Sequence, residues 1–291
     1  MAVPRRRKNE QLAIERKAAP MQTKTVMFDH PGWLATDEGH VRAVRTSSGA
    51  HIVVCRPDAD GGHAVETAPL GGGSGSGPVF DVFDPADLEG TDPVAANLRK
   101  AGPVARLRNP DLWDAIATSI IRQVIRAGQA RKLYRQFSGV HGERITTSAG
   151  EGLLFPGPDV VLSLPDEEFA RLGLAFKRKP LRAAAEAFME FGTKWSELAA
   201  DELAVEIQTV PRIGPWTAGA TVADVTNDYA LYPFADLAVR TWAKRLAPGR
   251  SWPDDESQFA LVWQELARDQ LSERTLLTLA WGVRHANGVA L

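Results

Sequence analysis

An aspartate and a tryptophan, twenty residues apart, have the surroundings that best suit chemistry. Asp236 stands alone among apolar residues in PFADLAV, where a carboxylate either caps a helix or takes part in a reaction. Trp216 follows a Pro-Arg-Ile-Gly-Pro turn and opens a segment rich in Ala, Thr and Val. An ionised carboxylate can stabilise a developing positive charge or activate a water molecule. An indole ring can stack on a flat or cationic ligand.

A helix, a turn and a second helix are predicted to position these two side chains. Pro211 and Gly214 break the chain between the segments DELAVEIQTV and 216–225, because proline fixes φ and glycine admits conformations closed to other residues. The free N–H groups of the second helix then point out of the turn and attract anions, among which a DNA phosphate is a natural candidate. ADLAVRTWAKRL predicts a further helix with Asp236 at or near its N-cap.

The composition is that of a folded protein without a membrane span or a cysteine-rich site. The 291 residues are 44% hydrophobic and 24% charged, which is enough for one large domain or two smaller ones. No apolar run could span a bilayer, and MAVPRRRKNEQ lacks the hydrophobic core of a secretory signal. The single cysteine, Cys55, excludes an internal disulfide and a four-cysteine metal or iron–sulfur site. We therefore expect no metal site and a reducing, cytoplasmic setting.

The distribution of charge is more informative than its sum. The formal net charge is −2, yet residues 99–135 hold nine basic side chains against two acidic ones. Residues 171–182 add five basic side chains and no acid. Such runs are often solvated helix faces, but two of them in a net acidic chain favour a surface that faces phosphates.

Local patterns predict an α+β, predominantly α fold in three parts. Residues 1–21 form a basic arm that would add salt-sensitive affinity for DNA. Residues 22–78 contain four short strand-like runs, which indicate a small antiparallel sheet that ends in a Gly/Ser loop. Residues 79–291 follow helical periodicity, with helix pairs separated near Gly128 and at Gly173, and contain the helix-hairpin-helix.

The hairpin, with Trp216 at its exit and Asp236 at this distance, resembles the helix-hairpin-helix base-excision DNA glycosylases. The chain is most similar to their 3-methyladenine DNA glycosylase II branch, and the likeness covers residues 79–285. Its strongest points are DPADLEG, TSIIRQV, LGLAFKRKPLRAAAEAF and VPRIGPWTAGA. The resemblance implies an enzyme that flips a damaged base, most simply an alkylated purine, out of duplex DNA and hydrolyses its N-glycosidic bond. It implies no cofactor, and it leaves open whether a monovalent cation binds at the hairpin.

The resemblance also implies roles for the residues around the base. Asp236 becomes the catalytic carboxylate, and Trp216, Ala220 and Glu273 fall at positions that line the base pocket. Members that also cleave the strand carry a lysine where Trp216 stands, so a DNA N-glycosylase without lyase activity is expected. Trp216 also fits a core position between the hairpin helices. The position of Glu273 agrees with two roles, that of a proton donor and that of an ordinary exposed residue at a helix start.

Gln123 and Val124 stand where related proteins place a wedge that fills the gap left by the flipped base. Gln123 would contact the estranged base and Val124 would be the plug, although Val124 also fits the apolar face of its helix. Arg212 replaces the first glycine of the usual hairpin, which would reshape or supplement its display of N–H groups. The expected contacts to the DNA backbone are Arg122, Arg126, Lys177, Arg178, Arg212, Ile213, Gly214 and Thr217.

Two alternatives remain open at this point. The same fold could act on an oxidised or deaminated base, or the protein could be a non-catalytic DNA-binding or damage-sensing module. Arg212 and the small number of aromatic rings in the pocket sustain the second alternative. In each case the expected partner is double-stranded DNA with a damaged base, bound by a monomer in the cytoplasm in association with the nucleoid.

Overall fold

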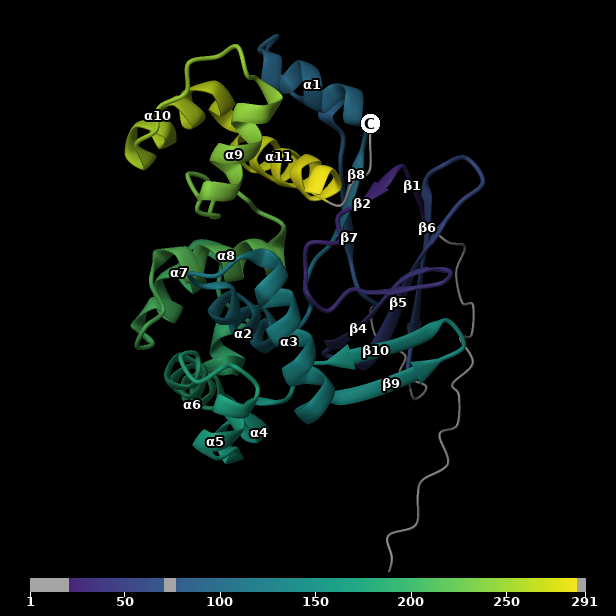
Figure 1. The fold of residues 1–291 in the computed structure, drawn as a ribbon, viewed down its shortest axis with the longest axis vertical. Coiled ribbons are helices and arrows are strands. Elements are labelled where there is room, and N and C mark those ends of the chain that lie inside the picture. The colour runs from purple at the N-terminus through teal and green to yellow at the C-terminus, as the bar shows by residue number, and fades with distance from the viewer. Residues whose placement is uncertain (1–20, 71–76, 287–291) are drawn as a thin grey trace, which may run out of the picture.

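The computed structural model describes residues 21–70 and 77–286. The first 20 residues of the predicted basic arm and most of the Gly/Ser loop lie outside the described residues. Helices α1, α9, α10 and α11 gather on one side of α8, helices α2 to α7 on the other, and the strands run along both groups (Figure 1). This is the predicted α+β architecture, predominantly helical with a small sheet.

The strands form two sheets and a separate hairpin. The larger sheet is antiparallel and has the order β1-β6-β5-β4-β3, with Val41 opposite Val54 in its centre. Its strands are β1 (Met21–Thr23), β3 (Leu34–Thr36), β4 (Gly39–Thr46), β5 (Gly49–Pro57) and β6 (His63–Pro69). In the second sheet β8 (Val104–Leu107) pairs parallel with β2 (Thr25–Val26) and antiparallel with β7 (Phe80–Phe83). The hairpin joins β9 (Glu143–Thr147) to β10 (Gly150–Leu154).

The expectation that the chain stays helical after residue 79 is wrong for β7 to β10. Strand β8 is buried along its whole length and pairs with a strand from the N-terminal part. Strand β10 lies against β4, where Gly152 makes room, since a Cβ there would come within 2.7 Å of the Ala43 Cβ. The N-terminal strands and the later ones are therefore interlocked.

The helices largely follow the predicted pattern. The break predicted near Gly128 instead falls at residues 123–126, and Gly128 lies inside α3. Gly173 separates α5 from α6 with a φ of 73°, as expected of a glycine at a helix end. The described helices are α1 (Pro93–Ala101), α2 (Leu112–Arg122), α3 (Ala127–His141), α4 (Pro158–Ser163), α5 (Asp166–Arg171), α6 (Arg178–Trp195), α7 (Ala200–Glu206), α8 (Pro215–Thr226), α9 (Leu237–Leu246), α10 (Glu256–Ala267) and α11 (Leu271–Ala286). None of them combines the length and apolar character needed to cross a membrane.

Helix α8 lies between two apolar cores. Ala218 and Val222 contribute to the core that contains α2, α3, α6 and α7, while Ala220 and Ala223 contribute to the core that contains α1, α9, α10 and α11. Both faces of α8 are therefore buried, and its small side chains let neighbouring elements approach closely. The second hairpin helix thus occupies the centre of the molecule.

Buried charges join the sheets to the helices. Arg106 of β8 donates to Asp224 of α8 at 2.7 Å and to Asp29 at 2.8 Å. Arg42 of β4 donates to Asp114 of α2 at 3.3 Å. Because buried charges are tolerated only when they are paired, these contacts fix how the sheets sit on α2 and α8.

Candidate active site and nucleic-acid interface

The hairpin turn, residues 210–214, follows α7 and a short 3-10 turn (Ile207–Thr209). Ile213 is buried and anchors the turn in the core around α2 and α6. Arg212 is exposed and has a φ of 72°, in the left-handed region that glycine adopts most easily. The arginine thus adopts a backbone conformation that the usual hairpin glycine would take without strain.

Helix α8 begins directly after this turn with an open N-terminus. Gly214 is the N-cap residue and no side chain caps the helix, while Pro215 occupies the first helical position. The N–H groups of Trp216 and Thr217 belong to the first turn, which has no acceptors within its own helix. Such an end is suited to an anion, so the predicted backbone contacts of Gly214 and its neighbours remain a prediction.

The wedge turn, residues 123–125, is bonded to the hairpin turn. The Gln123 side-chain nitrogen donates to Thr217 Oγ1 at 2.7 Å and to the Arg212 carbonyl at 3.2 Å. Helix α2 ends before Gln123, so Val124 does not continue the apolar face of that helix. Val124 is fully exposed with a φ of 60°, a rare combination for a β-branched residue. The fold therefore presents an apolar side chain to solvent beside the uncapped N-terminus of α8.

Two arginines flank the wedge turn in different ways. Arg126 is exposed at the N-cap of α3, and its phosphate contact remains a prediction. Arg122 is partly buried and faces the interior. Burial lowers the pKa of its guanidinium, but the nearby Tyr232 and Asp29 raise it by more, so that the pKa lies above its ordinary value. Arg122 therefore lies beside Tyr232, a position less suited to the predicted phosphate contact than that of Arg126.

Lys177 and Arg178 also differ from the predicted phosphate contacts. Lys177 is 3% exposed, and its Nζ donates to the Gln123 carbonyl at 2.7 Å. Arg178 lies 2.5 Å from Asp166 in an ion pair between α5 and α6. Lys177 is thus engaged with the wedge turn, whereas Arg178 is held in an ion pair at the protein surface.

Asp236 is the N-cap of α9 and is only partly buried. One carboxylate oxygen accepts from the Leu237 N–H at 2.7 Å, and the other accepts from the Tyr232 hydroxyl at 3.4 Å. The helix N-terminus favours a negative charge at this position. Burial and the nearby Asp236 raise the pKa of Tyr232, while Arg122 lowers it. The pKa stays above its ordinary value, so the hydroxyl keeps its proton and remains a donor. Asp236 is therefore a cap whose carboxylate is not sealed in the core.

The loop before Asp236 lies directly on α8. A Cβ at Gly219 would come within 2.2 Å of the Leu231 carbonyl oxygen, so the loop backbone touches the helix less than one turn from Trp216. Tyr232 in the same loop is close enough to Arg122 for the two to alter each other's pKa. The hairpin turn, the wedge turn and the loop that carries Asp236 therefore converge.

More aromatic rings lie near this junction of the three segments than the sequence predicted. Trp216 is partly buried and packs against the core of α9 and α11, as do Phe234 and Trp242. Ala220 is buried in the same core, so it underlies the site and does not line an open pocket. Tyr232 and Phe234 were not singled out from the sequence because their loop has no periodicity. Their proximity to Asp236 along the chain was the available signal.

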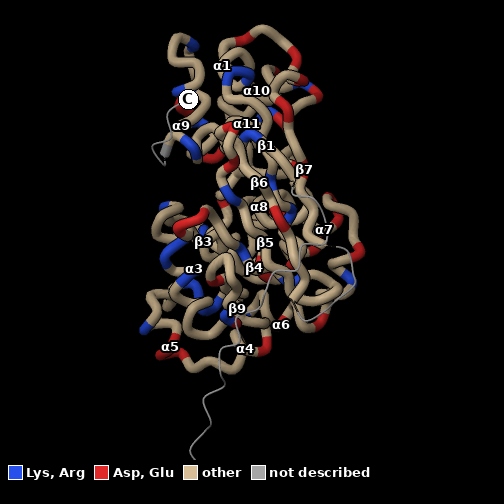
Figure 2. Tube along the Cα trace, turned by 90° about the vertical axis from the view of Figure 1, so that its right-hand side faces the viewer, with Lys and Arg blue, Asp and Glu red and all other residues tan. Residues whose placement is uncertain are grey.

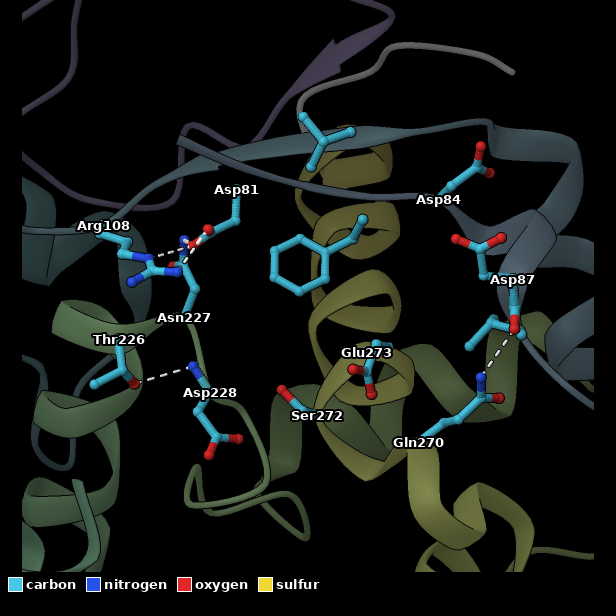
Figure 3. Close-up of a pocket in the computed structure, with 13 residues that line it drawn as sticks. Asp81, Asp84, Asp87, Arg108, Thr226, Asn227, Asp228, Gln270, Ser272 and Glu273 are labelled. Atoms are coloured by element: carbon cyan, nitrogen blue, oxygen red, sulfur yellow. Dashed lines mark hydrogen bonds and ion pairs between the residues drawn. The ribbon is translucent and has the colours of Figure 1, made fainter. Parts of the chain in front are cut away.

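Glu273 lies in a different place from the one predicted. It lines an acidic cavity of about 660 Å³, where Arg108 pairs with Asp81 at 2.6 Å (Figure 3). This cavity touches Thr226 at the C-terminal end of α8, whereas Trp216 lies at the N-terminal end, about 15 Å away by the rise of the helix. The structure therefore does not bring Glu273 together with Trp216, and the predicted pocket role does not fit.

Only part of the basic cluster at residues 99–135 faces solvent. Lys and Arg lie along α3 on the side of the molecule that also carries α9 (Figure 2). Arg126 and Lys132 are exposed there, whereas Arg106 is buried among its acidic partners. Arg240 donates to the Asp254 carbonyl and so does not pair with Asp236. Among the described residues, no three His, Cys, Asp or Glu side chains are grouped to hold a metal ion.

Comparison with known proteins identifies the fold. No protein-family model and no curated protein matches the sequence. Among solved structures, the chain is similar to the 3-methyladenine DNA-glycosylase from Archaeoglobus fulgidus, with a TM-score of 0.65 and 20% identity over 87% of this chain and 90% of that one.

Two further structures extend this likeness. The 8-oxoguanine glycosylase/lyase of Clostridium acetobutylicum gives a TM-score of 0.64 at 13% identity, with 91% of this chain and 99% of that chain covered. The 3-methyladenine DNA glycosylase Mag1 of Schizosaccharomyces pombe, solved with abasic DNA, gives 0.52 at 19% identity, with 71% and 97% covered. The chain therefore has the fold of the helix-hairpin-helix DNA glycosylases.

Proposed function

We propose that this protein is a monofunctional DNA glycosylase that releases alkylated purines from duplex DNA. The observation that carries the proposal is the meeting of three features on adjoining segments. These are the exposed Val124, the uncapped N-terminus of α8 and the partly exposed carboxylate of Asp236. The fold supports the coarser part of this proposal, a DNA glycosylase, since it is shared with DNA glycosylases of more than one substrate class.

The first two features serve to open the duplex. The N-terminus of α8 and the exposed Arg212 and Arg126 bind phosphates of one strand. Val124 enters the base stack and fills the space that the extruded nucleotide leaves. Flipping costs a few kcal/mol, which is smallest for a damaged and weakly paired base.

Asp236 acts on the flipped nucleotide. As the bond between C1′ and the base nitrogen breaks, the deoxyribose acquires positive charge, which the carboxylate stabilises. A water molecule oriented by the same carboxylate adds its oxygen to C1′ and gives up a proton, while the base leaves with the bonding electrons. The hydrogen bonds from Tyr232 and Leu237 hold the carboxylate in one orientation during this step.

The surroundings of Asp236 favour a cationic leaving base. Glu273, the acid that the sequence offered as a proton donor, lines the cavity at the opposite end of α8. A base that is already positively charged through alkylation leaves as a neutral molecule without a donor. The Trp216 ring, partly exposed beside the loop of Asp236, would contribute up to about 2 kcal/mol by stacking on such a cation.

A panel of lesions in otherwise identical duplexes tests the substrate class. We expect release of 7-methylguanine and 3-methyladenine under single-turnover conditions, and little release of 8-oxoguanine or uracil. Release of the uncharged lesions alone would overturn the assignment to alkylated purines. Release of no base at all would overturn the assignment as an enzyme.

Borohydride trapping tests the monofunctional part of the proposal. Trp216 at the hairpin exit cannot form a Schiff base with C1′. We therefore expect no covalent protein–DNA adduct when the protein is treated with borohydride on a methylated or an abasic duplex. A trapped adduct that survives denaturation would show a lyase nucleophile and contradict this part.

A further inference from the structure

The environment of Lys177 is unusual for a lysine. Its ammonium is buried, donates to the Gln123 carbonyl at 2.7 Å and lies 5.1 Å from the centre of the Phe176 ring. No carboxylate in the described part of the chain pairs with it. Burial of an unpaired ammonium is costly, so the fold retains it at the expense of stability.

The hydrogen bond from Lys177 to Gln123 lies next to a backbone position with an unfavourable conformation. Gln123 is the C-cap of α2, where carbonyls lack a partner within the helix. The next residue, Val124, has the left-handed φ of 60°. The Gln123 side chain is tied to Thr217 of the hairpin helix, while its carbonyl is tied to Lys177 at the start of α6. Gln123 is thus held by α8 through its side chain and by the start of α6 through its carbonyl.

We propose that Lys177 is a positioning residue that holds the wedge turn in its left-handed conformation and so keeps Val124 directed outward before DNA binds. The step from this conformation to insertion into DNA rests on the proposed function. The clamp itself is a property of the free protein, and it can be tested without DNA.

The charge of Lys177 is open to titration near physiological pH. Burial lowers its pKa to about 8. Its contacts, Gln123 and Phe176, do not ionise. The charged groups nearest to it along the chain and beside the turns are the exposed Lys179, Arg178 with its partner Asp166, Arg122 and Arg126 on either side of the wedge turn, and Arg212 of the hairpin turn. All of these arginines stay charged from pH 7 to 9.5.

Hydrogen exchange tests the clamp in the absence of DNA. We expect Lys177→Met to accelerate exchange at residues 123–126 by at least about tenfold, because methionine donates no hydrogen bond and the whole charge-assisted bond to the Gln123 carbonyl is lost. Methionine fills similar space, so the melting temperature should not fall. Lys194→Met is the matched control, because Lys194 lies on the same helix but is exposed and paired with Glu206. Unchanged exchange in Lys177→Met would overturn the clamp.

A pH profile of wedge insertion separates positioning from general support of the fold. Insertion is read from the fluorescence of 2-aminopurine beside an abasic analogue, with Val124→Ala as the variant that has lost the plug. For the wild type we expect about a fivefold fall in insertion from pH 7 to 9.5. Lys177→Arg should remove this fall, since arginine keeps its charge, and Lys177→Met should be low throughout.

Thermal stability should rise with pH while wedge insertion falls. Between pH 8 and 10.5 the unfolded chain binds the proton of Lys177 more tightly than the folded protein does. The wild type should therefore gain stability relative to Lys177→Met as insertion declines. A parallel loss of both quantities would contradict the proposal, as would identical insertion profiles for wild type and Lys177→Met. If the wild type inserts at no pH, the proposed function fails, while hydrogen exchange still decides on the clamp.

Discussion

At the scale of single residues, the site is built from two strained positions on neighbouring turns. Val124 and Arg212 both adopt left-handed backbone conformations, at a cost of about 1–3 kcal/mol each. Gln123 joins the two turns by hydrogen bonds, which lets the surrounding structure maintain the strain. Strain of this kind persists where the conformation itself is useful, here because it directs an apolar side chain into solvent.

Replacing Val124 with asparagine should separate stability from function. Asparagine adopts the left-handed region more easily and is polar, so we expect Val124→Asn to raise the free energy of unfolding by up to about 1 kcal/mol. The same change should weaken 2-aminopurine unstacking in lesion duplexes, because an apolar plug is lost. Thermal melts and the fluorescence assay measure the two effects.

Val140→Asn is the control, since Val140 is also exposed but lies inside α3. It should leave stability nearly unchanged, because valine and asparagine have similar helix propensities. If the two variants change stability equally, Val124 is not strained.

The sequence predicted some of these residues and not others, for physical reasons. Asp236 as a helix cap follows from local patterns, whereas Gln123 and Val124 were singled out through the resemblance to related proteins. The internal role of Lys177 could not be predicted, because burial of a lysine depends on what α6 packs against. Glu273 was misplaced because a position in sequence relative to the hairpin does not say on which side of α8 a helix start will lie.

At the scale of elements, α8 determines the geometry of the site. Its N-terminus meets the wedge turn, its middle carries the loop of Asp236 through Gly219, and each of its faces belongs to a different core. Helix periodicity predicted such elements well. The four-residue strands β7 and β8 were missed because they are short and β8 pairs with a partner distant in sequence.

A methyl group at Gly219 should displace the loop that carries Asp236. The Cβ would lie 2.2 Å from the Leu231 carbonyl, a contact that backbone movement must relieve. We expect Gly219→Ala to cost about 1–3 kcal/mol in stability and to reduce base release by at least about tenfold, while DNA affinity changes less. Denaturant unfolding, single-turnover release and duplex binding measure these quantities.

Gly139→Ala is the matched control for this substitution. Gly139 lies in α3 with no atom near its missing Cβ, so alanine there should stabilise the protein by up to about 1 kcal/mol. Normal base release by Gly219→Ala would mean that the loop does not depend on this close approach.

At the scale of the whole molecule, buried polar groups hold the sheets and the helices together. His30 lies at the centre of these contacts, with its Nε2 3.1 Å from Thr118 Oγ1 and 3.3 Å from Asp114. Burial lowers the pKa of His30 well below 6.5, and Arg42 lowers it further. Burial raises the pKa values of Asp224 and Asp29, but Arg106, together with Arg42 and Asn109 at Asp224, lowers them by more, so that both lie below their ordinary values.

Stability should therefore fall as the pH drops below about 6.5. The unfolded chain takes up a proton at His30 in this range, whereas the folded protein does not. The paired aspartates keep their charge throughout this range, because their pKa values in the folded protein lie below the unfolded value near 4. We expect the stability difference between the wild type and His30→Gln to shrink between pH 7.5 and 5. A constant difference for His30→Gln would contradict this assignment.

The most direct test of the account is single-turnover release of 7-methylguanine by the wild type and by Asp236→Asn. Affinity for a duplex with an abasic analogue is measured alongside. We predict release by the wild type, a loss of at least about 10³-fold in the variant, or about 4 kcal/mol in the barrier, and affinities within about threefold of each other. Release by Asp236→Asn at the wild-type rate would contradict the role of this carboxylate.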